Sequence, residues 1–355
     1  MTKFEKLFSQ LPDSVDCVLI TSDINRRYFT DMKSSDGTLI AFRDKAYLII
    51  DFRYIEKARA TVTAAEVIEQ KKLYSQLAEL IHEHNAANAA IESQSLTVSR
   101  LHTLRSQLKD IEIIDTDVLS NAVNALRSVK DEYEIDCIKK AQAIAEKAFD
   151  GILGYIREGV TERQIALELN RLMFEYGAED LSFETIALSG ANTSMPHGVP
   201  SDKKVMTGEF VLLDFGAVYN GYHSDMTRTV CVGEPDDEMR RIYNIVLEAQ
   251  TAALEAAHAG MMGHELDSVA RGIISDEGFG NCFGHSLGHG VGLEIHERPN
   301  AAPNYKQTLN AGAVVTVEPG IYIAGRFGVR IEDFVILTEN GCINLTKSAK
   351  NIISL

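Results

Sequence analysis

Two acidic residues flank a tight-turn signal in the second half of the chain. Asp214 and Asp225 lie on either side of Asn220-Gly221, and Asn-Gly between β-prone segments is typical of a two-residue hairpin loop. With that loop, Asp214 would face Thr227, and Asp225 would lie on the same face, about 7–8 Å away diagonally. Because Asp214 interrupts the apolar run Phe210–Leu213, both acids would be costly to bury unless they were paired or bound a cation. The hairpin therefore predicts a divalent-metal site, with solvated acids on an exposed hairpin as the alternative.

A glycine-rich segment from Phe283 to Pro299 supplies histidines. It reads FGHSLGHGVGLEIHERP and contains His285, His289 and His296. Glycines allow the backbone to approach a bound group closely, and a neutral imidazole is a good ligand for a borderline divalent metal. A lone histidine would more often be a satisfied polar residue, but three in one glycine-rich loop favour a functional site.

Two further acids occur in similar apolar surroundings near the end of the chain. Glu318 ends the β-rich run Val314–Val317, and Glu332 interrupts the returning segment GVRIEDFVIL. Four carboxylates and one histidine have the composition of a two-metal hydrolytic site, with the metals about 3.5–4 Å apart. Carboxylate-rich ligation favours two Mn²⁺ ions, with Co²⁺ or Zn²⁺ as substitutes.

The elements before these residues predict a separate α/β unit over residues 1–125. Strands are expected at 15–21, 38–42, 46–50, 90–91 and 111–114, and helices at 73–84 and 98–108. Strands that alternate with helices imply a layered sheet. The segment DFRY, Asp51–Tyr54, is interpreted as a turn with a capped helix, and a cluster of polar site residues is the alternative.

The remaining residues, 126–355, are expected to form a second domain with an internal repeat. A long helix is predicted from Glu132 to about Ile156, and the segments that begin at Arg157 and His258 resemble each other. Thr161 forms a capping box with Gln164 at the start of one predicted helix. A duplicated unit of this kind can close around a pseudo-two-fold axis, and a site at the axis would receive residues from both halves.

The composition excludes several classes of partner. The chain has 355 residues and a net charge of −16, which argues against non-specific binding to nucleic acid or to an acidic membrane. No apolar run is long enough to span a bilayer, and the first residues lack the apolar core of a signal peptide. The five cysteines are scattered and contain no CxxC pair, so a cytoplasmic protein with reduced cysteines is expected.

Together these segments resemble the pita-bread metallopeptidase family, which includes aminopeptidase P, prolidase and methionine aminopeptidase. The similar segments are LLDFGAVYNGYHSDMTRT, GHSLGHGVGLEIHE, EPGIY and GVRIED, and SSDG and DFRY resemble the creatinase-like N-terminal domain of the proline-specific branch. The resemblance covers essentially the whole chain. It implies an α/β (α+β) protein, with a creatinase-like N-terminal α/β domain followed by a pita-bread catalytic domain that contains a pseudo-two-fold αβ repeat.

The resemblance also implies the residues that hold the metals. The expected ligands of two divalent ions are Asp214, Asp225, His289, Glu318 and Glu332. Asp225 and Glu332 would bridge both ions, and a water between the ions would have a lowered pKa and act as the nucleophile. Glu318 would also carry a proton to the departing amine.

Other residues match positions around the substrate in the same family. His197 would lie near the leaving side of the substrate, and His296 would donate to the scissile carbonyl oxygen. His285 would be a further pocket residue. Arg330 would pair with a metal-bound carboxylate, and Tyr322 would line the pocket.

The branch of the family sets the expected substrate, which is a peptide with proline at its second position. A dipeptidase must recognise the carboxylate that follows proline, usually with arginine, but Asn300 stands where related prolidases have that arginine. This favours an Xaa-Pro aminopeptidase, with an Xaa-Pro dipeptidase (prolidase) as the alternative, because Arg298 could substitute. A creatinase or a non-catalytic peptide-binding module would be expected to lack some of the five ligands. The resemblance further implies a homodimer.

Overall fold

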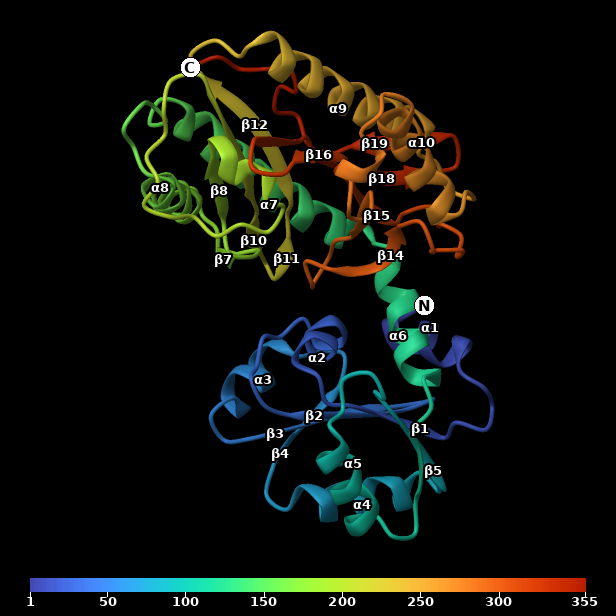
Figure 1. Ribbon diagram of the computed structural model, residues 1–355. Helices are drawn as coiled ribbons and strands as arrows, with labels where there is room; N and C mark the ends of the chain where they lie inside the picture. Colours follow the sequence, from blue (N-terminus) through green and yellow to red (C-terminus); the bar gives the residue numbers. More distant parts are fainter. The chain divides into compact units, whose positions relative to one another are not determined.

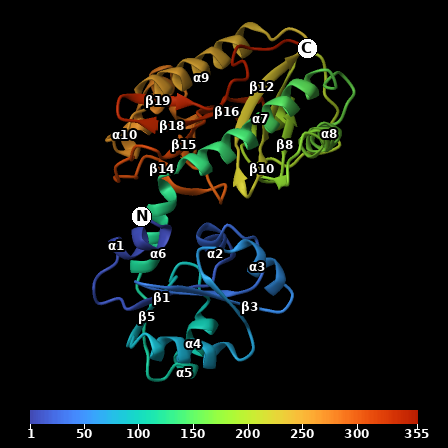
Figure 2. The same ribbon diagram turned by 180° about the vertical axis from the view of Figure 1, so that it is seen from behind.

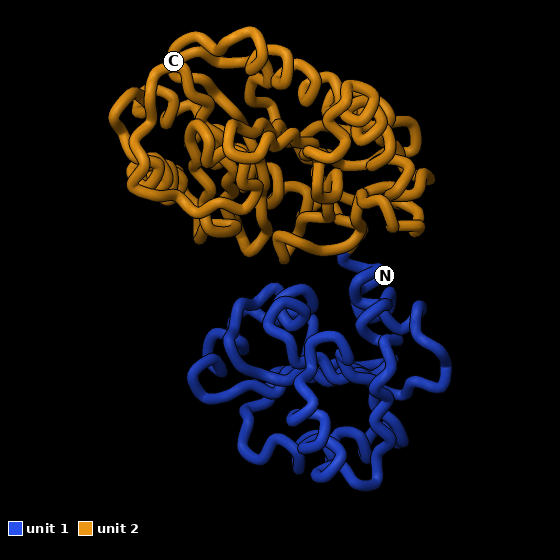
Figure 3. Tube along the Cα trace, viewed as in Figure 1, with its two compact units in different colours: residues 1–127 blue, residues 128–355 orange.

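The computed structural model describes residues 1–355, which form two compact units, Met1–Arg127 and Ser128–Leu355 (Figure 3). Each unit has its own buried apolar core. None of the helices is both long enough and apolar enough to cross a membrane.

The N-terminal unit contains one mixed six-stranded sheet with the order β4-β3-β2-β1-β5-β6 (Figure 1). Its strands are β1 (Cys17–Ile20), β2 (Thr38–Phe42), β3 (Ala46–Ile50), β4 (Glu66–Glu69), β5 (Asn88–Ile91) and β6 (Glu112–Ile114). Its helices are α1 (Lys3–Gln10), α2 (Asp23–Thr30), α3 (Ile55–Thr61), α4 (Leu73–Glu83), α5 (Val98–Gln107) and α6 (Val118–Ser128). The expected α/β layering is confirmed, and β1, β2 and β3 are buried throughout, as continuous apolar runs predict.

Several elements of this unit were not predicted. Helix α2 is short, begins at the N-cap Ser22 and buries the polar Arg26 beside Tyr28 and Phe29. Helix α6 runs through the expected domain boundary at Ala125. The segment Asp51–Tyr54 is a turn followed by α3, as expected, but Tyr54 makes no side-chain capping hydrogen bond.

The C-terminal unit contains two pairs of helices, α7–α8 and α9–α10, each pair in contact. They are α7 (Glu132–Leu153), α8 (Glu162–Glu175), α9 (Asp237–Ala256) and α10 (Gly263–Asp276), with short 3₁₀ helices η1 (Gly190–Ser194) and η2 (Gly280–Cys282). Helix α7 crosses one face of the strands, behind them in Figure 1 and in front of them in Figure 2. The predicted capping box of Thr161 and Gln164 is present. The repetition of helix pair followed by strands is the expected internal repeat.

The strands of this unit form four small sheets. They are β7 (Asp180–Leu181), β8 (Ile186–Ser189), β9 (Glu209–Phe215), β10 (Ala217–Tyr219), β11 (Tyr222–His223), β12 (Met226–Val232), β13 (Gly288–Gly290), β14 (Glu297–Ala301), β15 (Val314–Val317), β16 (Gly320–Ile323), β17 (Phe327–Arg330), β18 (Asp333–Thr338) and β19 (Gly341–Asn344). The sheet orders are β11-β10-β7, β12-β9-β8, β14-β13-β15-β18-β19 and β16-β17.

Two long hairpins place the four acids. In the first, Asn220 and Gly221 form the two-residue loop with φ of 47° and 79°, and Asp214 pairs with Thr227, as predicted. In the second, Val317 pairs with Asp333 and Gly320 pairs with Arg330, so the same register places Glu318 opposite Glu332. Each hairpin changes from one sheet to another close to these acids: Asp225, Glu318 and Glu332 lie in the breaks between strands, and Asp214 lies two residues before a break, near the end of β9.

A buried arginine fixes the backbone beside the second hairpin. Arg228 in β12 is 1% exposed and pairs with the fully buried Asp333 at 2.7 Å. Its guanidinium also donates to the carbonyl oxygens of Glu332, Ser348 and Ala349. Arg228 therefore joins the first hairpin to the second and to the C-terminal segment.

Substitution of this arginine should destabilise the C-terminal unit. Arg228→Met leaves the Asp333 carboxylate buried without its main partner, so we expect the free energy of unfolding to fall by about 3–5 kcal/mol in chemical denaturation. Arg241→Met is the matched control, because its ion pair with Glu277 is 61% and 47% exposed, and it should change the free energy by less than about 1 kcal/mol. Equal effects of the two substitutions would contradict this role of Arg228.

Candidate active site

The predicted site residues converge on one cavity of about 560 Å³ within the C-terminal unit. This volume is in the range of pockets that hold small molecules. The lining includes nine of the ten predicted residues: His197, Asp214, Asp225, His285, His289, His296, Glu318, Arg330 and Glu332. Tyr322 was expected in the lining but lies behind it, where its hydroxyl contacts His285 and Arg330.

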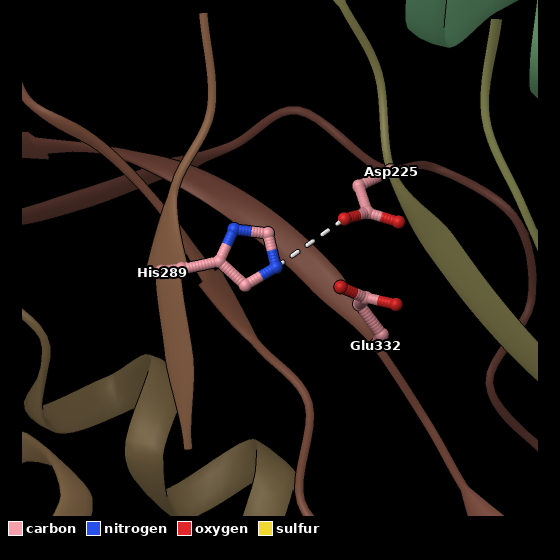
Figure 4. Close-up of side chains that lie close together, drawn as sticks. All are labelled: Asp225, His289 and Glu332. Atoms are coloured by element: carbon pink, nitrogen blue, oxygen red, sulfur yellow. Dashed lines mark ion pairs between the residues drawn. The ribbon is translucent and has the colours of Figure 1, made fainter. Parts of the chain in front are cut away.

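Three side chains of the cavity lining, from three separate segments of the chain, point toward one another (Figure 4). Asp225 immediately precedes β12, His289 lies in β13 and Glu332 immediately precedes β18. One ligand atom from each lies within 4.8 Å of the others. The His289 Nε2 atom is 3.6 Å from Asp225 Oδ2 and 3.4 Å from Glu318 Oε1. These separations leave space for a cation between the groups.

The protonation of His289 is suited to metal binding. Its Nδ1 atom lies 3.1 Å from the carbonyl oxygen of Gly290, which can only accept a hydrogen bond, so Nδ1 carries the proton. The lone pair of the ring is then on Nε2, which faces the acids. Burial lowers the pKa of His289, which keeps the ring neutral.

The acids lack enough partners of their own. Asp214 Oδ1 and Glu332 Oε1 are buried without a hydrogen-bond partner, although buried polar atoms are normally paired. Burial, together with repulsion from neighbouring carboxylates, raises the pKa values of Asp225 and Glu332 well above their usual range. Burial also raises the pKa of Glu318 to about 7, although the charge of Arg330 opposes this shift. The residues present therefore fit a group of divalent cations.

An arginine, a tyrosine and a histidine form a hydrogen-bonded chain beside the acids. Arg330 donates to Asp214 Oδ2 at 2.6 Å and to the Tyr322 hydroxyl oxygen at 2.7 Å. Tyr322 then donates to His285 Nε2 at 2.9 Å, because His285 Nδ1 donates to the Ser286 carbonyl oxygen. Burial and the charge of Arg330 lower the pKa of His285 to about 4. The ring of His285 is thus neutral, and both of its nitrogens are occupied.

The other two histidines lie at the cavity without such a chain. The ring of His296 packs edge-on against His289, with 4.3 Å between the ring centroids. His197 lies in the segment between η1 and β9. Both side chains are available to a molecule in the cavity.

Two threonines that the sequence analysis did not identify orient the acids. Thr227 donates to Glu332 Oε2 at 2.7 Å. Thr316 donates to Glu318 Oε1 at 3.0 Å and accepts from the backbone N–H of His289. Thr227 lies two residues after Asp225, and Thr316 lies two residues before Glu318, near the ends of β12 and β15. In an extended chain this spacing places both side chains on one face. That alternation was the signal that could have found them.

A partly buried ion pair holds the segment that contains His285. Asp267 on α10 is 1% exposed, pairs with Arg271 and accepts from the backbone N–H of Leu287. Arg271 donates to the carbonyl oxygens of Phe283 and His285. The sequence did not indicate this pair, because an Asp and an Arg one helical turn apart are common on exposed helix faces and their spacing does not mark a site.

The raised pKa of Glu318 predicts a pH-dependent stability for the metal-free protein. Between its usual pKa of 4.5 and about 7, Glu318 binds more protons in the folded state than in the unfolded state. Its contribution to stability is therefore present at low pH and is lost as the pH rises through this window. Relative to metal-stripped wild type, Glu318→Gln should gain roughly 2 kcal/mol in unfolding free energy from about pH 5 to about pH 8.

The exposed Glu339 provides the control for this measurement. Glu339→Gln should follow the wild-type pH curve, because its carboxyl group is solvated in both states. Parallel curves for Glu318→Gln and wild type would show that Glu318 is not buried among unneutralised acids.

Comparisons with known proteins identify a family for each of the two parts of the chain. Residues 136–339 match Metallopeptidase family M24, and residues 6–129 match the Creatinase/Prolidase N-terminal domain. The Xaa-Pro dipeptidase of Pyrococcus furiosus is 41% identical over 355 residues, which is 99% of each chain.

Solved structures give the same result. The structure of an Xaa-Pro dipeptidase from Bacillus anthracis is similar with a TM-score of 0.96 and 42% identity, over 99% of both chains. An X-Pro aminopeptidase from Thermotoga maritima is similar with a TM-score of 0.90 and 39% identity, over 96% of this chain and 98% of that one. The predicted creatinase-like and pita-bread architecture is therefore confirmed. The chain belongs to metallopeptidase family M24, in which it combines the peptidase domain with a creatinase/prolidase N-terminal domain.

Proposed function

We propose that this chain is a divalent-metal-dependent Xaa-Pro dipeptidase, which hydrolyses the bond between an N-terminal residue and a following proline. The observation that carries the proposal is the group of four carboxylates and His289 around one cavity. The substrate class follows from relatives named Xaa-Pro dipeptidase that are 41% and 42% identical over nearly the whole chain. These names favour the dipeptidase over the aminopeptidase that Asn300 suggested in the sequence.

Two divalent ions fit the charge of the site better than one. The proposed ligands are Asp214, Asp225, His289, Glu318 and Glu332. Arg330 is the only arginine in the lining, which contains no lysine. Arg330 neutralises one of the four ionised carboxylates. A single divalent ion does not carry enough positive charge to neutralise the other three. Mn²⁺ is the proposed metal because most of the ligands are carboxylates. When bound, such ions polarise a carbonyl oxygen and make a water acidic enough to act as a nucleophile at neutral pH.

The side chains around the metal ligands have separate roles in proton transfer and substrate binding. Glu318, held in orientation by Thr316, carries a proton to the departing amine. His296 lies against the ring of His289 and donates its N–H to the carbonyl oxygen of the scissile bond as negative charge develops there. His197 lies on the leaving side of the substrate.

Two of the predicted residues have supporting roles in this scheme. His285 shapes the cavity and transfers no proton, because Tyr322 and the Ser286 carbonyl group occupy both of its nitrogens. Arg330 fixes the orientation of Asp214 through their 2.6 Å contact. The homodimer implied by the sequence remains a prediction for sedimentation measurements.

An Xaa-Pro aminopeptidase is the second candidate, and one observation favours it. Asn300 lines the cavity, whereas the side chain of Arg298 does not. Arg330 is already bound to Asp214, Thr227 and Tyr322. The cavity therefore has no free arginine or lysine that could bind the carboxylate of a dipeptide. Longer peptides do not need such a residue, because their proline is followed by a peptide bond.

Hydrolysis of matched peptides tests the proposal. Metal-stripped enzyme should cleave an Xaa-Pro dipeptide only after Mn²⁺ is added. The kcat/KM for the dipeptide should exceed that for the matching Xaa-Pro-Xaa tripeptide by about tenfold or more, because the dipeptide carboxylate would accept a hydrogen bond from a neutral donor of the lining such as the Asn300 amide, and a hydrogen bond to a charged group contributes about 1.5–3 kcal/mol. Proline release measured by chromatography reports the rate.

Two controls complete the design. Glu332→Gln, treated with the same metal, should lose the activity, and an Xaa-Ala dipeptide should be a poor substrate for the wild type. Faster cleavage of the tripeptide would replace the dipeptidase with the aminopeptidase. Absence of cleavage by metal-loaded enzyme would favour a peptide-binding role.

A further inference from the structure

Glu162 is a completely buried acid outside the group of proposed ligands. It is the first residue of α8 and follows the N-cap Thr161. Its Oε1 atom accepts from the backbone N–H of Ser189 at 2.7 Å and from the Asn192 amide at 3.0 Å. Its Oε2 atom accepts from the backbone N–H of Ser201 at 3.0 Å and from the Ser201 hydroxyl at 2.6 Å.

These contacts close a segment of the cavity lining, residues 189–201, which we call the His197 loop. Ser189 is the last residue of β8, and Ser201 lies where the chain returns to α8. One carboxylate oxygen therefore holds the beginning of the His197 loop, and the other oxygen holds its end. Between these ends lie five consecutive residues that line the cavity: Pro196, His197, Gly198, Val199 and Pro200.

The middle of the His197 loop has few anchors of its own. Val199 is 75% exposed. The hydroxyl groups of Thr193 and Ser194 accept from the backbone of Gly328 and Gly325, but both lie before the lining residues. From Met195 to Pro200, the only backbone hydrogen bonds are short-range turns within the loop, from Met195 to Asn192 and from Gly198 to Met195, and the next backbone contact is at Ser201, whose carbonyl oxygen accepts from the Arg163 N–H. The position of His197 thus depends on the two ends that Glu162 holds.

We propose that Glu162 is a positioning residue, which keeps the His197 loop in the conformation that binds substrate. The proposal rests on the peptidase function described above. Without the carboxylate, backbone donors at both ends lose their acceptor, and the loop populates conformations that do not bind substrate. The apparent affinity for substrate then falls in proportion to the fraction of molecules whose His197 loop is in the binding conformation. Saturating substrate restores the competent conformation, so the maximal rate changes little.

The chain supplies a matched control in Glu92 of the N-terminal unit. Glu92 is 2% exposed and accepts from the backbone N–H groups of Thr21 and Ser22, the Ser22 hydroxyl and the Asn25 amide. Its donors are of the same kinds as those of Glu162, but Glu92 does not line the cavity. Glu92→Gln therefore measures how much stability is lost when an amide replaces a buried carboxylate of this kind, without a change in the His197 loop.

The experiment compares Glu162→Gln, Glu92→Gln and wild type in the full-length, Mn²⁺-loaded enzyme. Both variants should have a lowered Tm. In Glu162→Gln alone, the KM for an Xaa-Pro dipeptide should rise about tenfold while kcat stays within about threefold of wild type. Hydrogen exchange without substrate should show faster exchange in Glu162→Gln at the end of the loop that faces the glutamine NH₂ group, at the Ser189 or the Ser201 amide, and wild-type rates of both amides in Glu92→Gln.

A second variant keeps the test decisive if Glu162→Gln does not fold. Ser201→Ala removes one donor at the end of the His197 loop and should raise KM in the same way, to a smaller extent. Unchanged KM and unchanged amide exchange in the folded variants would overturn the proposal. If wild type cleaves no Xaa-Pro peptide, the proposed function fails, whereas faster exchange confined to residues 189–201 would still support anchoring by Glu162.

Discussion

The C-terminal unit depends on four carboxylates that share one cavity with a single arginine. Asp225 and Glu332 are 4% and 1% exposed, and two buried oxygens of Asp214 and Glu332 have no partner. Ionised acids in such a site repel one another unless positive charge is added. Bound cations would remove this repulsion, so the metals proposed for the chemistry would also stabilise the arrangement at neutral pH.

The surrounding structure holds the backbone at these acids so that repulsion does not separate them. Each long hairpin changes sheets close to the acids, and Arg228 joins the two hairpins through the Glu332 carbonyl oxygen and Asp333. Thr227 fixes the Glu332 carboxylate, and Arg330 fixes Asp214. The same principle extends to the substrate side, where buried acids on α8 and α10 hold the segments that contain His197 and His285.

Local patterns in the sequence predicted the parts that depend on neighbouring residues. Asn220-Gly221 determined the register of the first hairpin, and the apolar runs determined β2 and β3 to the residue. Contacts between distant segments were not predictable in this way. Glu162 contacts Ser201 from 39 positions away, and nothing in the local sequence of either residue indicates the pairing. Arg298 and Asn300 are two residues apart in β14, and in a regular strand their side chains would lie on the same face of the sheet. A register shift in the pairing of β13 with β14 interrupts this regular alternation.

The most direct measurement of the central claim is a crystal structure of the Mn²⁺-loaded protein with anomalous diffraction data. We expect two anomalous peaks in the cavity, within bonding distance of the carboxylates of Asp225 and Glu332, with His289 Nε2 directed at one of them. A crystal grown with Mn²⁺ that shows no peak at these side chains, or a peak only elsewhere, would contradict the account. The buried carboxylates would then need another source of positive charge.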